Sequence, residues 1–344
     1  MLCLGIESTA HTFGVGIADE KGKVFSNVRS VYKPKIGGIH PTEAQAHHLE
    51  KACETISIAC EQAKIKISDI DIFSFSAGPG IPKCLRVGAV ACRMLSQKFS
   101  KPIIPVNHCI AHIEIGKIST GLADPVTLYV SGGNTQILAF AEGRYRVFGE
   151  TQDIGVGNLL DQFGRTAGLP FPGGPEIERL ALQGKKFIEL PYVVKGMDVS
   201  FSGILTDCER KLKTEKLEDL CFSLQENVFA MLVETTERAM AHTEKNECLL
   251  TGGVAANKRL AEMLKIMCEE RGAKFAVVPR EYSGDCGAMI AWVGILEFLT
   301  QKKSDDFSAR KNPSRIFITG KKYSLEQTKI NRFWRSDDVE ISWL

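Results

Sequence analysis

Apolar and polar residues alternate in the same way along two distant segments of the chain, residues 2–28 and 126–149. Each segment has an apolar run, a small polar turn, a second apolar run, a charged turn and a third apolar run. Alternation with a period of two around turns that contain glycine or aspartate is typical of antiparallel β-hairpins. We therefore expect an internal repeat in which each half of the fold opens with a hairpin.

Helices are expected between and after these hairpins. We predict them at residues 44–64, 82–97, 158–168, 217–245 and 255–272. In the last one, four apolar residues share a face that we interpret as core and not as a binding face: Leu260, Met263, Leu264 and Met267.

The order of these elements predicts an α/β protein with two lobes around a nucleotide cleft. We expect the first lobe at residues 1–120 and the second, which carries a helical insertion, at 121–300. Residues 301–344 would form a tail that packs back on the fold, with a candidate edge strand at 339–343.

Composition adds little to this picture, because 44% hydrophobic and 24% charged residues describe ordinary globular material. The net charge is only +2, so contact with RNA would depend on a local basic patch. The candidates are Lys33, Lys35, Lys83, Arg86 and the basic residues of 210–213.

The cysteines and the amino-terminal sequence indicate the expected location. Eleven cysteines without a CxxC pair, in a chain without a signal-peptide pattern, favour a reducing compartment. We expect a cytoplasmic protein, with the nucleus left open as a second location. No membrane association is expected, since no apolar segment reaches the roughly 20 residues that a spanning helix needs.

Three small or glycine-rich turns follow apolar strands, at residues 7–9, 131–135 and 252–257. Glycine lets a backbone approach a ligand closely, so that successive N–H groups can surround an anion. One such turn alone joins strands in any protein, but a matched pair within a repeat and a third turn that opens a helix favour a bound nucleotide. The chain lacks a Walker A sequence and a GxGxxG motif after its first strand, which argues against the P-loop and Rossmann classes.

A candidate metal site lies in the segment 107–114, where His108 and His112 are four residues apart. If Asn107 caps a helix, both imidazoles project from one face and can bind one metal ion, with a third ligand from elsewhere. The alternative is a solvated helix face, but the apolar neighbours favour the ligand role. A zinc peptidase would need glutamate directly after the first histidine, and Cys109 stands there, so peptidase activity is not expected.

Several long segments, in the same order, resemble the universal tRNA threonylcarbamoyltransferase family, formerly described as O-sialoglycoprotein endopeptidases. They are residues 5–10, 107–114, 129–136, 149–158 and 195–205. The resemblance extends over essentially the whole chain and is greatest to the archaeal and eukaryotic branch, the catalytic subunit of the KEOPS complex. It implies a duplicated actin/Hsp70-like (ASKHA) fold.

The resemblance also implies the residues of the site. His108, His112 and Asp285, with Tyr129 nearby or coordinating, would hold one divalent metal ion, iron or zinc. Threonylcarbamoyl-AMP, or an AMP- or ATP-type nucleotide, would be bound by Tyr129, Val130, Ser131, Gly132, Gly133, Asp161, Gly174, Glu178 and Asn257. Cys286 stands where the family usually has asparagine. Glu7 is a candidate to accept the proton of the attacking amine, or only to orient a ligand or water.

The implied reaction transfers the threonylcarbamoyl group to the exocyclic amine of the adenosine next to the anticodon, in tRNAs that read codons beginning with adenine. The implied partners are tRNA and the KEOPS subunits: a small atypical protein kinase, a dimerising subunit and a kinase-binding subunit. The alternatives are an ATP-hydrolysing or phosphoryl-transferring enzyme of the same fold class and a non-catalytic nucleotide-binding scaffold. The histidine pair argues against the first, since magnesium prefers oxygen ligands, and the intact set of candidate ligands argues against the second.

Overall fold

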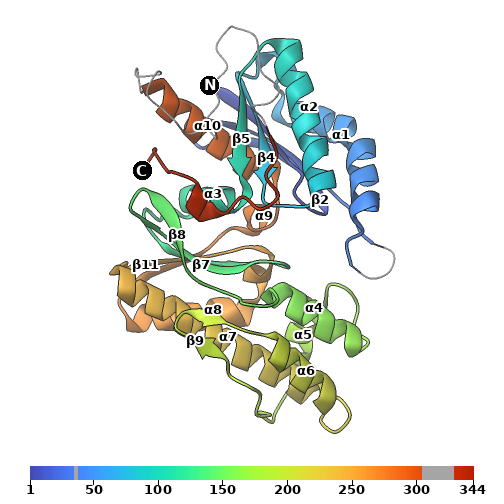
Figure 1. The fold of residues 1–344 in the computed structure, drawn as a ribbon, viewed down its shortest axis with the longest axis vertical. Helices are drawn as coiled ribbons and strands as arrows, with labels where there is room; N and C mark the ends of the chain where they lie inside the picture. The colour runs from blue at the N-terminus through green and yellow to red at the C-terminus, as the bar shows by residue number, and fades with distance from the viewer. Residues whose placement is uncertain (35–37, 304–328) are drawn as a thin grey trace. The chain divides into compact units, whose positions relative to one another are not determined.

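The computed structural model describes residues 1–34, 38–303 and 329–344 of the chain. These residues form two compact units: the first contains the described residues of 1–118 and 285–344, and the second contains residues 119–284. Each unit is an α/β layer structure built on its own five-stranded sheet (Figure 1).

The sheet of the first unit has the strand order β3-β2-β1-β4-β5. Strands β1 to β3 are antiparallel, and β4 and β5 continue the sheet parallel to β1. The strands are β1 (Leu2–Glu7), β2 (Thr12–Asp19), β3 (Val24–Val31), β4 (Ile72–Gly78) and β5 (Ile103–Asn107). The helices are α1 (Pro41–Ala63), η1 (Ile67–Asp69), α2 (Pro82–Phe99), α3 (His108–Thr120), α10 (Gly287–Lys303) and η4 (Ser336–Asp338).

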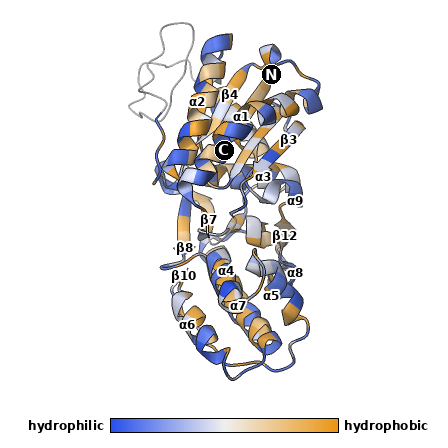
Figure 2. Cartoon of the chain, turned by 90° about the vertical axis from the view of Figure 1, so that its right-hand side faces the viewer, coloured by the Kyte–Doolittle hydropathy of each residue, from blue (hydrophilic) through white to orange (hydrophobic). Residues whose placement is uncertain are grey.

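Helices α1 and α2 pack together over a core that β1, β2 and β4 complete. Figure 2 shows hydrophobic residues along β4, and both hydrophobic and hydrophilic residues along α1 and α2. Helix α10 lies directly on β1 and β2 because glycine faces it there. A Cβ atom on Gly5 or Gly16 would come within 2.2 Å of the α10 backbone, at Ala291 N or Ala288 N.

The sheet of the second unit repeats this arrangement, with the order β12-β11-β6-β7-β8. Its first three strands along the chain are again antiparallel neighbours, and β11 and β12 are parallel to β6. The strands are β6 (Val126–Val130), β7 (Thr135–Ala141), β8 (Arg144–Glu150), β11 (Glu247–Thr251) and β12 (Lys274–Val277). The predicted hairpin repeat is thereby confirmed.

The remaining elements of the second unit are mainly helices, which bury the unit's core cluster against the sheet. They are α4 (Val156–Thr166), α5 (Gly173–Ala181), α6 (Ser202–Lys211), α7 (Leu217–Thr243), η2 (Gly253–Ala256), α8 (Lys258–Glu270) and α9 (Arg280–Ser283). A small ribbon pairs β9 (Val194–Lys195) with β10 (Asp198–Val199). In α8, Leu260, Leu264 and Met267 are buried and Met263 is partly buried, so the predicted core stripe is confirmed.

Two features differ from the sequence-based expectation. Residues 285–300 were expected in the second lobe, but they belong to the first compact unit, because the close contact of α10 with β1 and β2 holds them there. In the tail, residues 339–343 contribute to none of the strands of the described residues. The tail instead crosses the ends of β4 and β5, where Asn331 N donates to Ala77 O at 2.8 Å.

Within the described part of the chain, no helix has both the length and the apolar character that a membrane crossing requires.

Candidate metal centre and glycine turns

Helix α3 begins at the end of β5 and carries the two histidines of the predicted metal site. Asn107 caps it, since its Oδ1 accepts hydrogen bonds from Cys109 N at 3.0 Å and Ile110 N at 3.2 Å. His108 and His112 are 5% and 1% exposed. Their rings meet edge to face with centroids 4.7 Å apart. The two histidines are therefore neighbours in a buried position, and not on a solvated face.

Asp285, two residues before the start of α10, supplies a carboxylate to this pair. Its Oδ1 lies 3.4 Å from His108 Nε2 and 3.3 Å from His112 Nε2. The three candidate ligand atoms lie within 4.8 Å of one another. Two imidazole nitrogens and one carboxylate form a donor set that suits zinc or iron and leaves coordination positions open for a substrate.

Glu7, at the end of β1, lies behind His108 and is fully buried. Its Oε2 is 3.0 Å from His108 Nδ1, and its Oε1 accepts a hydrogen bond from Thr9 N at 2.6 Å. A carboxylate on one ring nitrogen keeps the proton there and directs the other nitrogen to a metal. The donor set therefore fits a metal ion, and Glu7 occupies the place of a residue that orients His108.

The environment of this cluster shifts the pKa values of the two histidines in opposite directions. Burial alone would lower the pKa of His108, but the Glu7 and Asp285 carboxylates raise it to about 9. Burial lowers the pKa of His112, and the charge of His108 adds to this effect. Burial would raise the pKa of Asp285, but His108 and His112 hold it well below its usual range. Carboxylate charge thus lies where the Nε2 atoms of His108 and His112 approach Asp285, which favours a cation there.

Cys109 and Cys286, which are next in sequence to His108 and Asp285, contribute no charge. Burial, with the charges of Asp285 and Glu7 nearby, raises the pKa of Cys109 to about 12. Burial raises the pKa of Cys286 to about 11. Both thiols are therefore neutral core groups next to the centre.

Asn107 also ties the centre to the carboxyl-terminal segment. Its Nδ2 donates to Trp334 O at 3.1 Å and Arg335 O at 3.4 Å, while its Oδ1 caps α3. One amide therefore connects the tail to the helix that carries both histidines.

Tyr129 and the nucleotide-binding candidates lie in the second unit. Tyr129 and Val130 are buried at the end of β6. The turn that follows is closed by a hydrogen bond from Ser131 N to Asn134 O at 2.8 Å. The start of α4 packs on this turn, because Gly157 N donates to Ser131 O at 3.1 Å.

The glycines of these turns are of two kinds. A Cβ on Gly155, Gly157 or Gly252 would come within 2.2–2.7 Å of a carbonyl oxygen of residues 130–132, so only glycine fits. Gly252 also has φ +99°. By contrast, apart from its chain neighbours, a Cβ on Gly133 or Gly253 would meet none of the described residues within 4 Å, and one on Gly132 would meet only Asn158 Oδ1 at 3.6 Å. The fold therefore requires glycine at positions 155, 157 and 252. The glycines at 132, 133 and 253 leave open space beside the backbone.

The other candidates in this unit have partners within the fold. Asp161 Oδ1 accepts from Gly173 N at 2.8 Å, next to Gly174 in the first turn of α5. Glu178 accepts from Lys258 N at 2.8 Å. Asn257 caps α8 and donates to Gln225 Oε1 at 3.0 Å. These side chains join neighbouring helices, and their contact with a nucleotide stays a prediction.

Asp153 is a residue of this region whose role the sequence pattern did not reveal. Its carboxylate accepts hydrogen bonds from Ile154 N, Phe201 N and Ser202 N and from the Ser202 hydroxyl. Partial burial would raise the pKa of Asp153, but these bonds lower it to about 2. Asp153 thereby fixes the loop before α4 to the start of α6.

We expect Asp153→Ala to lower the free energy of unfolding by about 1–2 kcal/mol at neutral pH, as loss of a helix cap does. Because the folded pKa is below the unfolded value, this contribution is complete above about pH 4 and disappears as the pH falls toward 2. Urea unfolding at about pH 7 and about pH 3 measures it. A difference between variant and wild type that stays the same at both pH values would contradict the role of the charge.

Comparison with known proteins places these features in a family context. The family model described as tRNA N6-adenosine threonylcarbamoyltransferase (TsaD) matches residues 23–292. The tRNA N6-adenosine threonylcarbamoyltransferase of Thermococcus sibiricus is 52% identical over 345 residues, and the match covers all of both chains. A probable bifunctional tRNA threonylcarbamoyladenosine biosynthesis protein of Methanothermobacter thermautotrophicus is also 52% identical, but the chain spans only 61% of its length.

Among solved structures, HypF of T. kodakarensis has a TM-score of 0.62 at 14% identity. The likeness covers 89% of this chain and 48% of HypF, and it concerns the fold alone. With the repeated sheet topology, it confirms the duplicated, actin-like α/β fold class predicted from the sequence.

Proposed function

Since this chain belongs to the tRNA N6-adenosine threonylcarbamoyltransferase family, we propose that the group it transfers to tRNA comes from threonylcarbamoyl-AMP and that a divalent metal ion at His108, His112 and Asp285 assists the transfer. The observation that supports this is the buried cluster of two imidazoles and one carboxylate, with Glu7 behind His108. The metal would be iron or zinc, and the acceptor would be the adenosine next to the anticodon in tRNAs that read codons beginning with adenine.

The reaction is a displacement at a carbonyl carbon. The exocyclic amine of adenosine attacks the carbamoyl carbon, the new N–C bond forms, the C–O bond to the phosphate breaks, AMP leaves and the amine loses one proton. When bound, a metal ion would polarise or align the threonylcarbamoyl group. His108, His112 and Asp285 would hold the ion, and Glu7 would keep His108 in the required orientation.

The open glycines of the second unit fit the role of an adenylate site. At Gly132, Gly133 and Gly253, no described residue beyond the immediate chain neighbours lies closer than 3.6 Å to the point that a Cβ atom would occupy. Backbone N–H groups with such space around them can approach a phosphate and stabilise its charge as AMP departs. The proposal also includes the predicted contacts of Tyr129, Asp161 and Glu178 with the nucleotide.

The experiment that tests this function is nucleoside analysis of tRNA after incubation with the protein and threonylcarbamoyl-AMP. We propose that the KEOPS subunits named above are partners, since a net charge of +2 gives no general attraction to a polyanion. The bifunctional relative, which is longer than this chain, supports a functional connection with a further domain. Modification should be weak with the chain alone and rise when partners are added. Absence of modified adenosine under both conditions would refute the proposed function.

Glu7→Gln distinguishes a residue that orients His108 from a catalytic base. Loss of the carboxylate behind a ligating histidine typically weakens metal binding about 10–100-fold. We therefore expect the variant to need more metal but to regain a kcat near the wild-type value at saturating metal. Metal titration of the transfer rate measures this, and a kcat that stays low at saturation would show that Glu7 takes part in the proton transfer.

A further inference from the structure

Three exposed cationic side chains lie at the same end of the first sheet as Glu7, the last residue of β1. Lys33 follows β3 by two residues, and Lys83 and Arg86 are three residues apart in the first turns of α2. We refer to Lys33, Lys83 and Arg86 as the cationic edge. Lys35, which the sequence also suggested, lies outside the described residues.

Hydrogen bonds connect the cationic edge to the turn between β1 and β2, residues 8–11. Tyr32, the neighbour of Lys33, donates its N–H to His11 O at 2.8 Å. Ile81, just before α2, donates its N–H to Thr9 O at 2.8 Å. Lys83 Nζ donates to Thr42 Oγ1 at 2.6 Å, so the starts of α1 and α2 are adjacent.

The same turn reaches the candidate metal centre. Thr9 N donates to Glu7 Oε1 at 2.6 Å, and Thr9 Oγ1 lies 3.5 Å from His108 Nδ1. The residues that position the cationic edge are therefore the direct neighbours of the residues that position His108.

Among the described residues, no acidic side chain pairs with the charges of the cationic edge. None of the ion pairs of the described residues includes Lys33, Lys83 or Arg86. Glu43, the acidic residue at the start of α1, accepts a hydrogen bond from the Tyr32 hydroxyl instead. Elsewhere exposed cations are commonly paired, as Lys51 is with Glu54 and Arg179 with Glu176.

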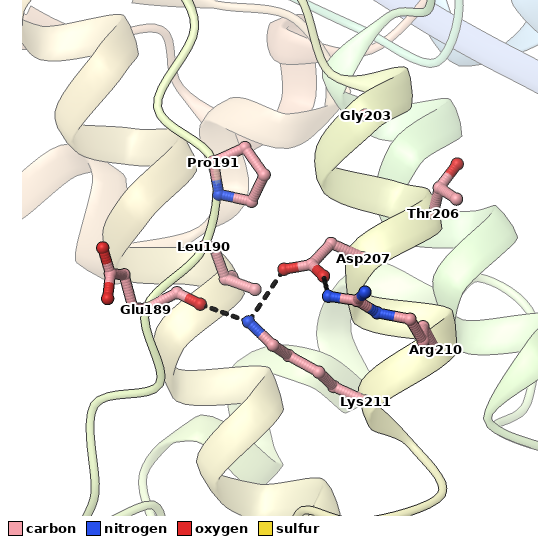
Figure 3. Close-up of a pocket in the computed structure, with 8 residues that line it drawn as sticks. All are labelled: Glu189, Leu190, Pro191, Gly203, Thr206, Asp207, Arg210 and Lys211. Carbon is pink, nitrogen blue, oxygen red and sulfur yellow. Dashed lines mark hydrogen bonds and ion pairs between the residues drawn. The ribbon is translucent and has the colours of Figure 1, made fainter.

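In the second basic candidate, residues 210–213, Arg210 and Lys211 already have an acidic partner. Figure 3 shows Lys211 between the Glu189 carbonyl and the Asp207 carboxylate, with Arg210 on the same carboxylate. These side chains line a pocket of about 500 Å³ whose cations are already paired. That pocket offers little free positive charge to a polyanion.

We propose that the cationic edge binds backbone phosphates of the substrate tRNA next to the adenosine that is modified. The proposal rests on the proposed function. Phosphate contacts position a nucleic acid without reading its sequence, and exposed cations free of acidic partners supply them. Three contacts are few, which agrees with the expected need for partner proteins.

The test compares two matched triple variants of the full chain. The first carries Lys33→Gln, Lys83→Gln and Arg86→Gln, and the control carries Arg210→Gln, Lys211→Gln and Lys213→Gln, which removes the same formal charge. The binding of a tRNA substrate is measured between about 50 and 200 mM salt. Metal content and thermal unfolding are recorded for both variants.

We expect the first variant to bind tRNA at least about tenfold more weakly at low salt, and its plot of log affinity against log salt to flatten by about 2, since each contact to single-stranded RNA contributes about 0.7. Metal content should not change, and the control should bind like the wild type. An unchanged slope, an equal loss in the control, or no tRNA binding by the wild type at low salt would overturn the proposal.

The nucleoside assay separates this result from the proposed function. If the wild type modifies tRNA and the first variant has the same KM for tRNA, the cationic edge is not a binding surface although the function stands. If the wild type with its partners forms no modified adenosine, the function itself fails. A raised KM with an unchanged kcat supports the proposal.

Discussion

Removal of His112 or Asp285 is expected to abolish metal binding and to lower the transfer rate at least about 100-fold, because a metal ion that assists at a carbonyl contributes several kcal/mol. His112→Ala removes an imidazole whose Nε2 is 3.3 Å from Asp285 Oδ1. Asp285→Asn keeps the shape of the side chain and removes its charge. Elemental analysis of the purified variants and nucleoside analysis of tRNA measure the two effects.

His108→Ala should have the same effect on the metal, but it also leaves Glu7 buried without its imidazole partner. An uncompensated buried charge destabilises a fold, so the His108 and His112 variants are compared by thermal unfolding. His242→Ala is the matched control, since this exposed histidine lies on α7 in the second unit. Stoichiometric metal in the His108→Ala/His112→Ala double variant would show that the cluster is not the metal site.

A large side chain at Gly132 or Gly253 is expected to weaken the binding of threonylcarbamoyl-AMP or AMP at least about 100-fold while the fold persists, because the side chain would fill space that the phosphate needs. The structure indicates that a side chain at either position should not strain the fold. Both positions lack the positive φ that would demand glycine, and a Cβ there meets at most Asn158 Oδ1 at 3.6 Å. Calorimetric titration of Gly132→Leu and Gly253→Leu with the nucleotide measures the affinity.

Gly252→Ala gives the contrasting result. Its Cβ would lie 2.2 Å from Val130 O, on a residue with φ +99°, so we expect a lower melting temperature whether or not ligand is present. Unchanged nucleotide affinity in both leucine variants would mean that these turns serve the fold alone.

The elements that the sequence predicted well are those with a clear period. The hairpins at 2–28 and 126–149 and the long helices α1, α2 and α7 agree with the structure within a few residues. Helix α10 was not predicted, because its residues 287–296 are apolar almost all round and have no polar face to set a period. Because it is apolar almost all round, α10 is buried on the sheet of the first unit.

The site was predictable to the extent that its residues are close in sequence. His108 and His112 lie on one helix, so spacing alone paired them. Asp285 is 173 residues from His112 and was expected only through the family resemblance. The contact of Glu7 with His108 depends on how β1 and β5 lie in the sheet, and the difference between Gly252 and Gly253 depends on local φ and on the nearest carbonyl. Neither this contact nor this difference can be recognised from the sequence pattern.

The discontinuous first unit has a consequence for the order in which the protein is made. Strands β1 to β5 and both histidines leave the ribosome early, but Asp285, helix α10 and the Trp334 and Arg335 carbonyls that hold Asn107 are synthesised only after the entire second unit. A nascent chain that ends at residue 284 therefore holds Glu7, His108 and His112 without the Asp285 carboxylate, and its sheet lacks the helix that lies on Gly5 and Gly16. The proposed metal site is thus complete only after the ribosome has passed the second unit, and a chain released before that point lacks Asp285.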